Sequence, residues 1–173
     1  VQGMLQLSRA EVGGALKFQA FDACEALQPC LAPASALANA KRVHLHTDCP
    51  SEPQVIESDR DGFQTIANNL LSNAVQYTQS GGSVNVCLAK QGPELVLEVK
   101  DTGIGMQQVD LERVFERFYR AQKDRSSETG GTGLGLSMVK HLTQALGGSV
   151  TATSEPGNGS TFVVRLPIAH QVD

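Results

Sequence analysis

The chain has 173 residues, a length that suits one compact domain, or one domain with a short attached segment. Hydrophobic residues make up 40% of it, enough for a substantial core, and 14 Lys and Arg against 18 Asp and Glu give a net charge of −4, which argues against a general nucleic-acid-binding protein. No apolar run reaches the ~20 residues of a membrane span and no signal peptide opens the chain, while the four cysteines lack CxxC and metal-ligand spacing. We therefore expect a cytoplasmic domain with reduced thiols and no direct contact with a membrane.

The beginning of the chain predicts a helix end, a break and a second helix. Residues 1–12 have the pattern of a helix that began earlier, and the two glycines that follow interrupt it. Asp22 has an acid three residues later and an apolar stripe beyond it, which is typical of a helix start. Pro29 and Pro33 predict that this helix is kinked or begins later than Asp22.

The rest of the chain is predicted to alternate between strands and helices. Ser58 and Asp61 can form a capping box for a helix over 59–78, whose apolar residues follow helical spacing. Further helices are expected over 109–118 and 134–146, and strands over 43–47, 55–57, 84–90, 95–100, 150–154 and 161–166. Strands that neighbour each other in sequence indicate an α/β two-layer sandwich with one mixed, mostly antiparallel sheet and about three helices on one face.

Three amide side chains lie on one stripe of the helix over 59–78. At about 100° per residue, Asn69, Asn73 and Gln76 fall within about 60° of each other, beside the apolar arc. This arrangement suits an edge that faces a ligand. A solvated polar face produces the same pattern, and by itself this pattern favours the solvated face.

An acid and two glycines follow directly on the apolar strand over 95–100. A carboxylate at a strand end, such as Asp101, can accept a hydrogen bond from the amino group of a base, while Gly103 and Gly105 let the backbone pass close to its ring. A tight turn with an exposed acid is the alternative. A dinucleotide-binding loop is excluded, because Gln108 occupies the position of the third glycine.

A glycine-rich segment, GGTGLGL over 130–136, opens the last predicted helix. Its backbone N–H groups can turn toward an anion, and the dipole of the helix favours phosphate there, although no Walker A sequence is present. Before it lie FERFYR over 115–120 and a polar stretch with Lys123 and Arg125. We expect the segment over 121–132 to form a lid whose cations close over phosphates, with an exposed basic loop as the alternative.

Taken together and in order, these segments resemble the catalytic ATP-binding domain of sensor histidine kinases, which belongs to the ATPase superfamily of gyrase B, Hsp90 and MutL. The five segments match the N, G1, F, G2 and G3 boxes of that domain: NLLSNAVQYT at 69–78, DTGIG at 101–105, FERFYR at 115–120, GGTGLGL at 130–136 and GNGSTF at 157–162. The resemblance runs from about Leu16 to Pro167 and is greatest to the phosphate-sensor-like subgroup of membrane sensors. It implies a Bergerat ATP-binding fold. It also allows for a parent protein that is anchored in the inner membrane.

The resemblance also implies a role for each matching residue, with ATP and Mg²⁺ as cofactors. Asp101 accepts from the adenine amino group, and Thr161 supports the same base through water. Asn69 and Asn73 are the catalytic pair, of which Asn73 holds Mg²⁺ by its amide oxygen. The full set of implied nucleotide-binding residues is Asn69, Asn73, Gln76, Tyr77, Asp101, Gly103, Gly105, Arg120, Arg125, Gly131, Thr132, Gly133, Leu134, Gly135 and Thr161.

The implied function is transfer of the ATP γ-phosphoryl group to a histidine that this sequence does not contain. None of its four histidines has the context of a phosphoacceptor, so we expect residues 1–14 to end a dimerisation hairpin that carries it and residues 15–170 to form the catalytic domain. The implied partners are this hairpin, a second copy of the chain and a response regulator.

Two positions bear on the alternatives to this function. Relatives commonly have Lys where Gln76 stands, which leaves open a regulatory nucleotide-binding module without transfer activity. ATP-hydrolysing relatives have Glu where Asn69 stands, so a stand-alone ATPase would lack its general base.

Overall fold

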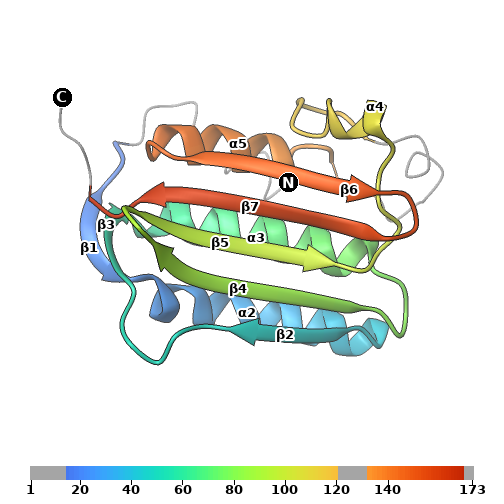
Figure 1. Ribbon diagram of the computed structural model, residues 1–173, viewed down its shortest axis with the longest axis horizontal. Coiled ribbons are helices and arrows are strands. Elements are labelled where there is room, and N and C mark those ends of the chain that lie inside the picture. The colour runs from blue at the N-terminus through green and yellow to red at the C-terminus, as the bar shows by residue number, and fades with distance from the viewer. Residues whose placement is uncertain (1–14, 121–131, 170–173) are drawn as a thin grey trace.

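A computed structural model describes residues 15–120 and 132–169. In this part of the chain, a five-stranded sheet in the order β2-β4-β5-β7-β6 has the helices α2, α3 and α5 on one face, and β1 and β3 form a separate two-stranded sheet (Figure 1). The strands are β1 (Phe18–Asp22), β2 (His44–Asp48), β3 (Val55–Asp59), β4 (Ser83–Gln91), β5 (Glu94–Asp101), β6 (Ser149–Glu155) and β7 (Gly159–Pro167). The helices are α2 (Ala23–Lys41), α3 (Arg60–Tyr77), α4 (Gln108–Leu111) and α5 (Gly135–Ala145).

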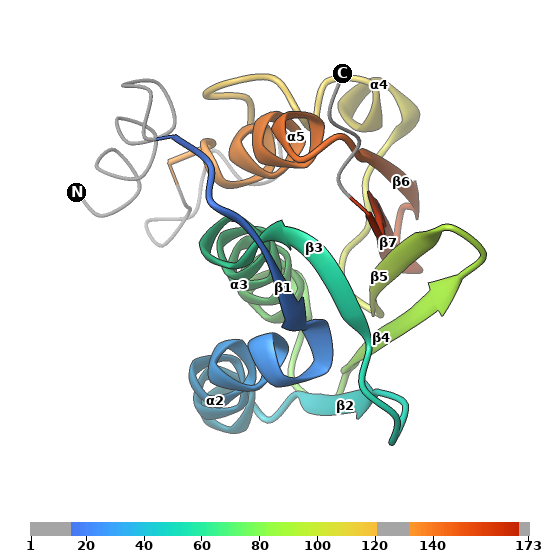
Figure 2. The ribbon, with the colours of Figure 1, turned by 90° about the vertical axis from the view of Figure 1, so that its left-hand side faces the viewer.

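The sheet and the helices form the two layers that the sequence predicts. In the large sheet, β2 runs parallel to β4 and every other pair is antiparallel. The side chains of each strand alternate between its two faces, so β4, β5 and β7 turn one apolar row toward the helices. Figure 2 shows the helices stacked on one side of the sheet, and Figure 1 shows β1 and β3 at the left-hand end of the molecule. The prediction of a mixed, mostly antiparallel two-layer sandwich is confirmed.

The helix α3 occupies the middle of the helical layer and contributes most to the core. Phe63, Ile66 and Leu70 are fully buried at helical spacing and pack between the sheet and the neighbouring helices. Burial of large apolar side chains contributes roughly 1.5–3 kcal/mol each, so this row anchors the helix firmly. The other side of α3 is free to line the site described below.

The start of α2 lies where Asp22 predicts it, so the alternative of a later start is wrong. Asp22 caps the helix, because its side chain accepts a hydrogen bond from the backbone N–H of Cys24 at 3.0 Å. The helix then continues through Pro29 and Pro33, both of which lie on its exposed side. The carbonyls that lose a partner there belong to the exposed residues Glu25 and Pro29, and access of water to them would reduce the cost of each proline.

Two other local predictions are wrong. Asp59, not the pair of Ser58 and Asp61, caps α3, because one of its oxygens accepts a hydrogen bond from the N–H of Gly62 at 2.7 Å. Its other oxygen accepts from the N–H of Lys17, before β1, at 2.6 Å. The helix expected over 109–118 is limited to α4, because turns and side-chain hydrogen bonds organise the residues after Leu111. The strand β1 was not predicted.

Candidate functional site

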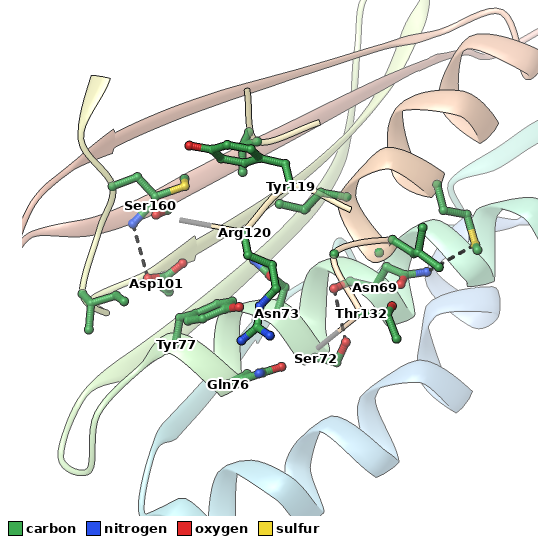
Figure 3. A pocket seen from close by; sticks show the side chains of 18 of the residues that line it. Asn69, Ser72, Asn73, Gln76, Tyr77, Asp101, Tyr119, Arg120, Thr132 and Ser160 are labelled. Carbon is green, nitrogen blue, oxygen red and sulfur yellow. Dashed lines mark hydrogen bonds between the residues drawn. The ribbon is translucent and has the colours of Figure 1, made fainter. Parts of the chain in front are cut away.

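A pocket opens between α3, the loop after β5, the segment before α5 and the start of β7 (Figure 3). Its cavity volume is about 240 Å³. Each of the five sequence segments contributes to its lining, and Met106, Val114 and Met138 add to it from outside them. The lining residues are Asn69, Ser72, Asn73, Gln76, Tyr77, Asp101, Ile104, Gly105, Met106, Val114, Tyr119, Arg120, Thr132, Gly133, Leu134, Gly135, Leu136, Met138 and Ser160.

One edge of α3 forms the floor of the pocket. Asn69, Ser72, Asn73, Gln76 and Tyr77 all line it, and their spacing of three and four residues places them on a single face of the helix. The structure therefore brings together the amide stripe seen in the sequence and directs it into a cavity. Ser72 was not singled out from the sequence, although its position three residues after Asn69 would have located it.

The amide of Asn69 is held in one orientation. Its nitrogen donates to the carbonyl oxygen of Thr65 at 2.8 Å and lies 4.0 Å from the sulfur of Met138. Its oxygen lies on the side of Gly135, where an added Cβ atom would approach it to 2.9 Å. Asn73, one turn later, makes no side-chain hydrogen bond to another described residue. The two amide oxygens are thus available to a cation, and oxygen ligands are those that Mg²⁺ prefers.

The end of α3 is fastened from two sides. The last four carbonyls of a helix have no partner within it, and here each receives a donor from elsewhere. The hydroxyl of Thr78 donates to the carbonyl of Ala74 at 2.7 Å, and Lys41 of α2 donates to those of Val75 at 2.8 Å and Gln76 at 2.5 Å. The carbonyl of the next residue, Tyr77, accepts from the N–H of Ile104 at 3.2 Å. These hydrogen bonds fix the last turn of α3, which carries the pocket residues Gln76 and Tyr77.

Asp101 lies at one end of the pocket and is 3% exposed. One of its oxygens, Oδ1, accepts from the N–H of Gly103 at 2.8 Å and from that of Ser160 at 3.3 Å, while Oδ2 accepts from no described residue. Burial raises the pKa of this carboxyl, and the two backbone hydrogen bonds lower it by less. A buried carboxylate with one uncommitted oxygen is suited to accept a hydrogen bond from a ligand.

Gly103 keeps Asp101 in place but does not itself line the pocket. A Cβ atom at this position would lie 2.3 Å from the carbonyl oxygen of Tyr77, so no other residue fits between α3 and the loop. Gly105 lines the pocket beside it. The loop after β5 therefore passes close to α3 because a glycine stands there.

The opposite end of the pocket is formed by the segment that leads into α5. Thr132, Gly133, Leu134 and Gly135 line it, and the N-terminus of α5 has no side-chain cap. Gly133 has a φ of 72°, and its carbonyl accepts from the N–H of Phe118 at 2.9 Å. The first N–H groups of an uncapped helix are unsatisfied and carry a partial positive charge, which suits a phosphate.

The segment after α4 places an aromatic ring and a cation, at residues 119 and 120, in the pocket. Tyr119 donates from its hydroxyl to Asp110 at 2.5 Å, and the guanidinium of Arg113 lies 4.4 Å from the centre of its ring. Arg120 follows it, and its side chain points toward Tyr77 and Gln76 (Figure 3). The sequence identified Arg120 but not Tyr119.

Ser160, and not Thr161, lies in the pocket. Neighbouring residues of a strand face opposite sides of the sheet, and Thr161 pairs with Lys100 and Thr153, two exposed residues of the outer face. The placement of Thr161 at the base is therefore corrected. Ser160 was missed, although the apolar alternation of Phe162, Val164 and Leu166 places Ser160, and not Thr161, on their face of β7. Arg125 and Gly131 lie outside the described residues, as do residues 1–14 and most of the expected lid.

Known proteins resemble this chain over most of its length. A family model described as histidine kinase-, DNA gyrase B- and HSP90-like ATPase matches residues 58–170, more than half of the chain. The chain belongs to this family. Membership gives the chain an ATP-binding domain and confirms the resemblance inferred from the five sequence segments.

Individual members of this ATPase family with high similarity are sensor kinases. Sensor-like histidine kinase SenX3 of Mycolicibacterium smegmatis is 37% identical over 167 residues, which cover 95% of this chain and 43% of SenX3. Sensor histidine kinase WalK of Bacillus subtilis is 39% identical over 129 residues, which cover 73% of this chain and 21% of WalK. The chain thus spans less than half the length of either relative.

Solved structures of histidine kinases share the fold. The catalytic domain of ThkA superposes with a TM-score of 0.77 at 21% identity, over 89% of this chain and 97% of that domain. Full-length ShkA, solved in complex with AMPPNP, superposes with a TM-score of 0.80 at 26% identity, over 99% of this chain and 36% of ShkA.

Among the described residues, no helix has the length and apolar character needed to cross a membrane.

Proposed function

We propose that this chain is the Mg²⁺-dependent ATP-binding catalytic domain of a sensor histidine kinase, and that it transfers the γ-phosphoryl group of ATP to a histidine on a dimerisation hairpin. The observation that carries the proposal is the composition of the pocket. It combines a buried carboxylate, two asparagine amides on one helix face and the uncapped start of α5. We take residues 1–14 as the end of the hairpin and residues 15–170 as the catalytic domain.

In this proposal Asp101 recognises the base. Its oxygen Oδ2 accepts from the adenine amino group, and Ser160 lies next to it. A guanine base would present an oxygen to the carboxylate, and two facing acceptors repel each other. Tyr77 of α3 and Met106 of the loop add apolar surface around the base.

The phosphates extend from the base toward the start of α5. The N–H groups after Leu134 would donate hydrogen bonds to the phosphate oxygens, and Arg120, from the segment after α4, would add a positive charge beside them. Asn73 would hold Mg²⁺ by its amide oxygen, with the amide of Asn69 beside it. When bound, the metal would neutralise part of the charge of the phosphates. These residues position the γ-phosphoryl group for in-line attack by an imidazole nitrogen of the acceptor histidine.

Asn69 distinguishes phosphotransfer from hydrolysis. A hydrolase needs a group that removes a proton from the attacking water, and an amide cannot do so. An imidazole of the acceptor hairpin can attack without such help. We further propose that the parent protein is a homodimer in which this domain meets its own hairpin, and that a response regulator receives the phosphoryl group on the cytoplasmic side.

Incubation of the chain with labelled ATP, Mg²⁺ and a separately produced histidine hairpin tests the proposal. We expect the label on the hairpin histidine, and we expect Asp101→Asn to abolish the transfer. Release of inorganic phosphate alone would indicate a stand-alone ATPase. Binding of ATP without either product would indicate a regulatory module, and absence of binding would overturn the proposal.

A further inference from the structure

A serine outside the pocket organises the base end of the pocket. Ser154 of β6 pairs across the sheet with Ser160 of β7. Its hydroxyl oxygen accepts from the N–H of Met106 at 2.8 Å, donates to the carbonyl of Gly159 at 2.9 Å and lies 2.8 Å from the hydroxyl oxygen of Ser160. Ser154 therefore connects three segments that meet beside Asp101.

The hydrogen between the two serines belongs to Ser160. A serine hydroxyl has one hydrogen to donate and two lone pairs that accept. The single hydrogen of Ser154 is used toward Gly159, so in its contact with Ser160 it must accept. Ser160 consequently spends its only hydrogen on Ser154, and toward the pocket it can act only as an acceptor.

Three neighbouring backbone donors are also in use. The N–H groups of Gly103 and Ser160 both donate to Asp101, and that of Met106 donates to Ser154. The side-chain polar groups of Asp101 and Ser160 that remain for a ligand at this end are the second oxygen of Asp101 and the lone pairs of the Ser160 hydroxyl. Both are acceptors, and adenine presents an amino group with two hydrogens here, whereas a 6-oxo purine presents an oxygen.

We propose that Ser154 is a specificity-determining positioning residue, which selects a 6-amino purine by holding the Ser160 hydroxyl in its accepting orientation. This inference rests on the proposed function, since it assumes that a purine occupies this end of the pocket. Ser154 does not line the pocket and acts through Ser160. Loss of its hydroxyl frees the Ser160 hydroxyl to donate to a 6-oxo group.

The test compares non-hydrolysable analogues of ATP and of inosine triphosphate, measured by calorimetry with Mg²⁺ on the full chain. In Ser154→Ala, we expect the preference for the adenine analogue to fall about three- to tenfold, the change produced by gaining one neutral hydrogen bond to the 6-oxo group. Ser154→Thr keeps the hydroxyl and should keep the preference. Thr153→Ala, on the outer face of the same strand, is the matched control and should also keep it.

Two further measurements separate this role from a general loss of structure. In a Ser160→Ala background, Ser154→Ala should change the preference by less than in the wild type, because part of its effect passes through the Ser160 hydroxyl. Hydrogen exchange of the Met106 amide should accelerate in Ser154→Ala without any nucleotide. A change in preference below twofold in Ser154→Ala, or unchanged exchange at Met106, would overturn the inference. Failure of the wild type to bind either analogue would overturn the proposed function together with it.

Discussion

Replacing Asp101 with asparagine alters a single atom of the side chain, and its surroundings determine which way the new amide faces. The oxygen at the Oδ1 position accepts from the N–H groups of Gly103 and Ser160. A reversed amide would turn its NH₂ group toward these two donors and leave them unsatisfied in a buried place. The amide oxygen therefore stays at Oδ1, and the NH₂ group faces the pocket.

This orientation sets the size of the loss in ATP affinity. The wild-type carboxylate provides a charged hydrogen bond of roughly 1.5–3 kcal/mol to the adenine amino group, and the variant provides none. The two facing donors add a penalty on the order of 1 kcal/mol. We expect Asp101→Asn to weaken binding by about 2.5–4 kcal/mol, which corresponds to roughly 60- to 700-fold.

Calorimetry with a non-hydrolysable ATP analogue and Mg²⁺ measures this change. Asp61→Asn is the matched control, since Asp61 is exposed in the first turn of α3 and does not line the pocket. Its affinity should equal that of the wild type. An affinity of Asp101→Asn within twofold of the wild type would refute the assignment of Asp101 to the base.

The same substitution should not destabilise the nucleotide-free protein. Burial raises the pKa of the Asp101 carboxyl, so the folded protein binds a proton more tightly than the unfolded chain does. The contribution of this group to the free energy of unfolding is therefore largest below its ordinary pKa and falls as pH rises through the raised value. At neutral pH, the buried charge of Asp101 lowers the free energy of unfolding. Asp101→Asn removes this charge, so thermal unfolding should occur at the same or a higher temperature. The difference should disappear in acid, where both side chains are uncharged.

Three further substitutions test other parts of the structure. Gln76→Lys should strengthen Mg²⁺-dependent ATP binding by about 1 kcal/mol, because a charged donor would face the phosphates. An unchanged or lower affinity, measured by calorimetry while Asn73→Ala removes the Mg²⁺ dependence, would show that residue 76 does not reach them. Lys41→Met should lower the free energy of unfolding, measured in urea, by about 1–2 kcal/mol, because two carbonyls at the end of α3 lose their donor. The control is Lys90→Met, at an exposed lysine of β4, which should have no effect. Arg42 has a φ of 59°, a left-handed conformation that glycine adopts without strain. Arg42→Gly should therefore raise the free energy of unfolding by about 1 kcal/mol without changing its slope against urea concentration. An equal or lower free energy of unfolding would contradict this reasoning.

The parts of the fold that follow from local sequence could be predicted, and those that depend on distant contacts could not. The core helix α3 has strong helical spacing, and the hairpin of β4 and β5 surrounds a clear turn, so both were expected. The strand β1 acquires its structure by pairing with β3, more than thirty residues away, and five residues without strict alternation do not reveal that partner. The segment after α4 was expected to be helical from its spacing, but tertiary hydrogen bonds such as that between Phe118 and Gly133 override it.

The site follows the same division. Asn69, Asp101 and the glycines before α5 could be identified because each belongs to a recognisable segment, and the order of the segments was informative. Ser160 and Thr161 are neighbours in one such segment, and the apolar alternation of β7 separates them. The position of Ser160 beside Asp101 depends on the register of β7 against β5, which the sequence does not reveal. Met106 and Met138 carry no signal in the sequence, since apolar residues in a loop and a helix are more often part of a core.

The position of β7 in the sheet has a consequence for synthesis of the protein. Although β7 is the last strand of the described chain, it lies inside the sheet, between β5 and β6. It brings Ser160 beside Asp101, a residue made about sixty positions earlier. A nascent chain therefore cannot complete the base end of the pocket until the ribosome has released β7, so ATP cannot assist the folding of the earlier elements and can stabilise only the finished domain.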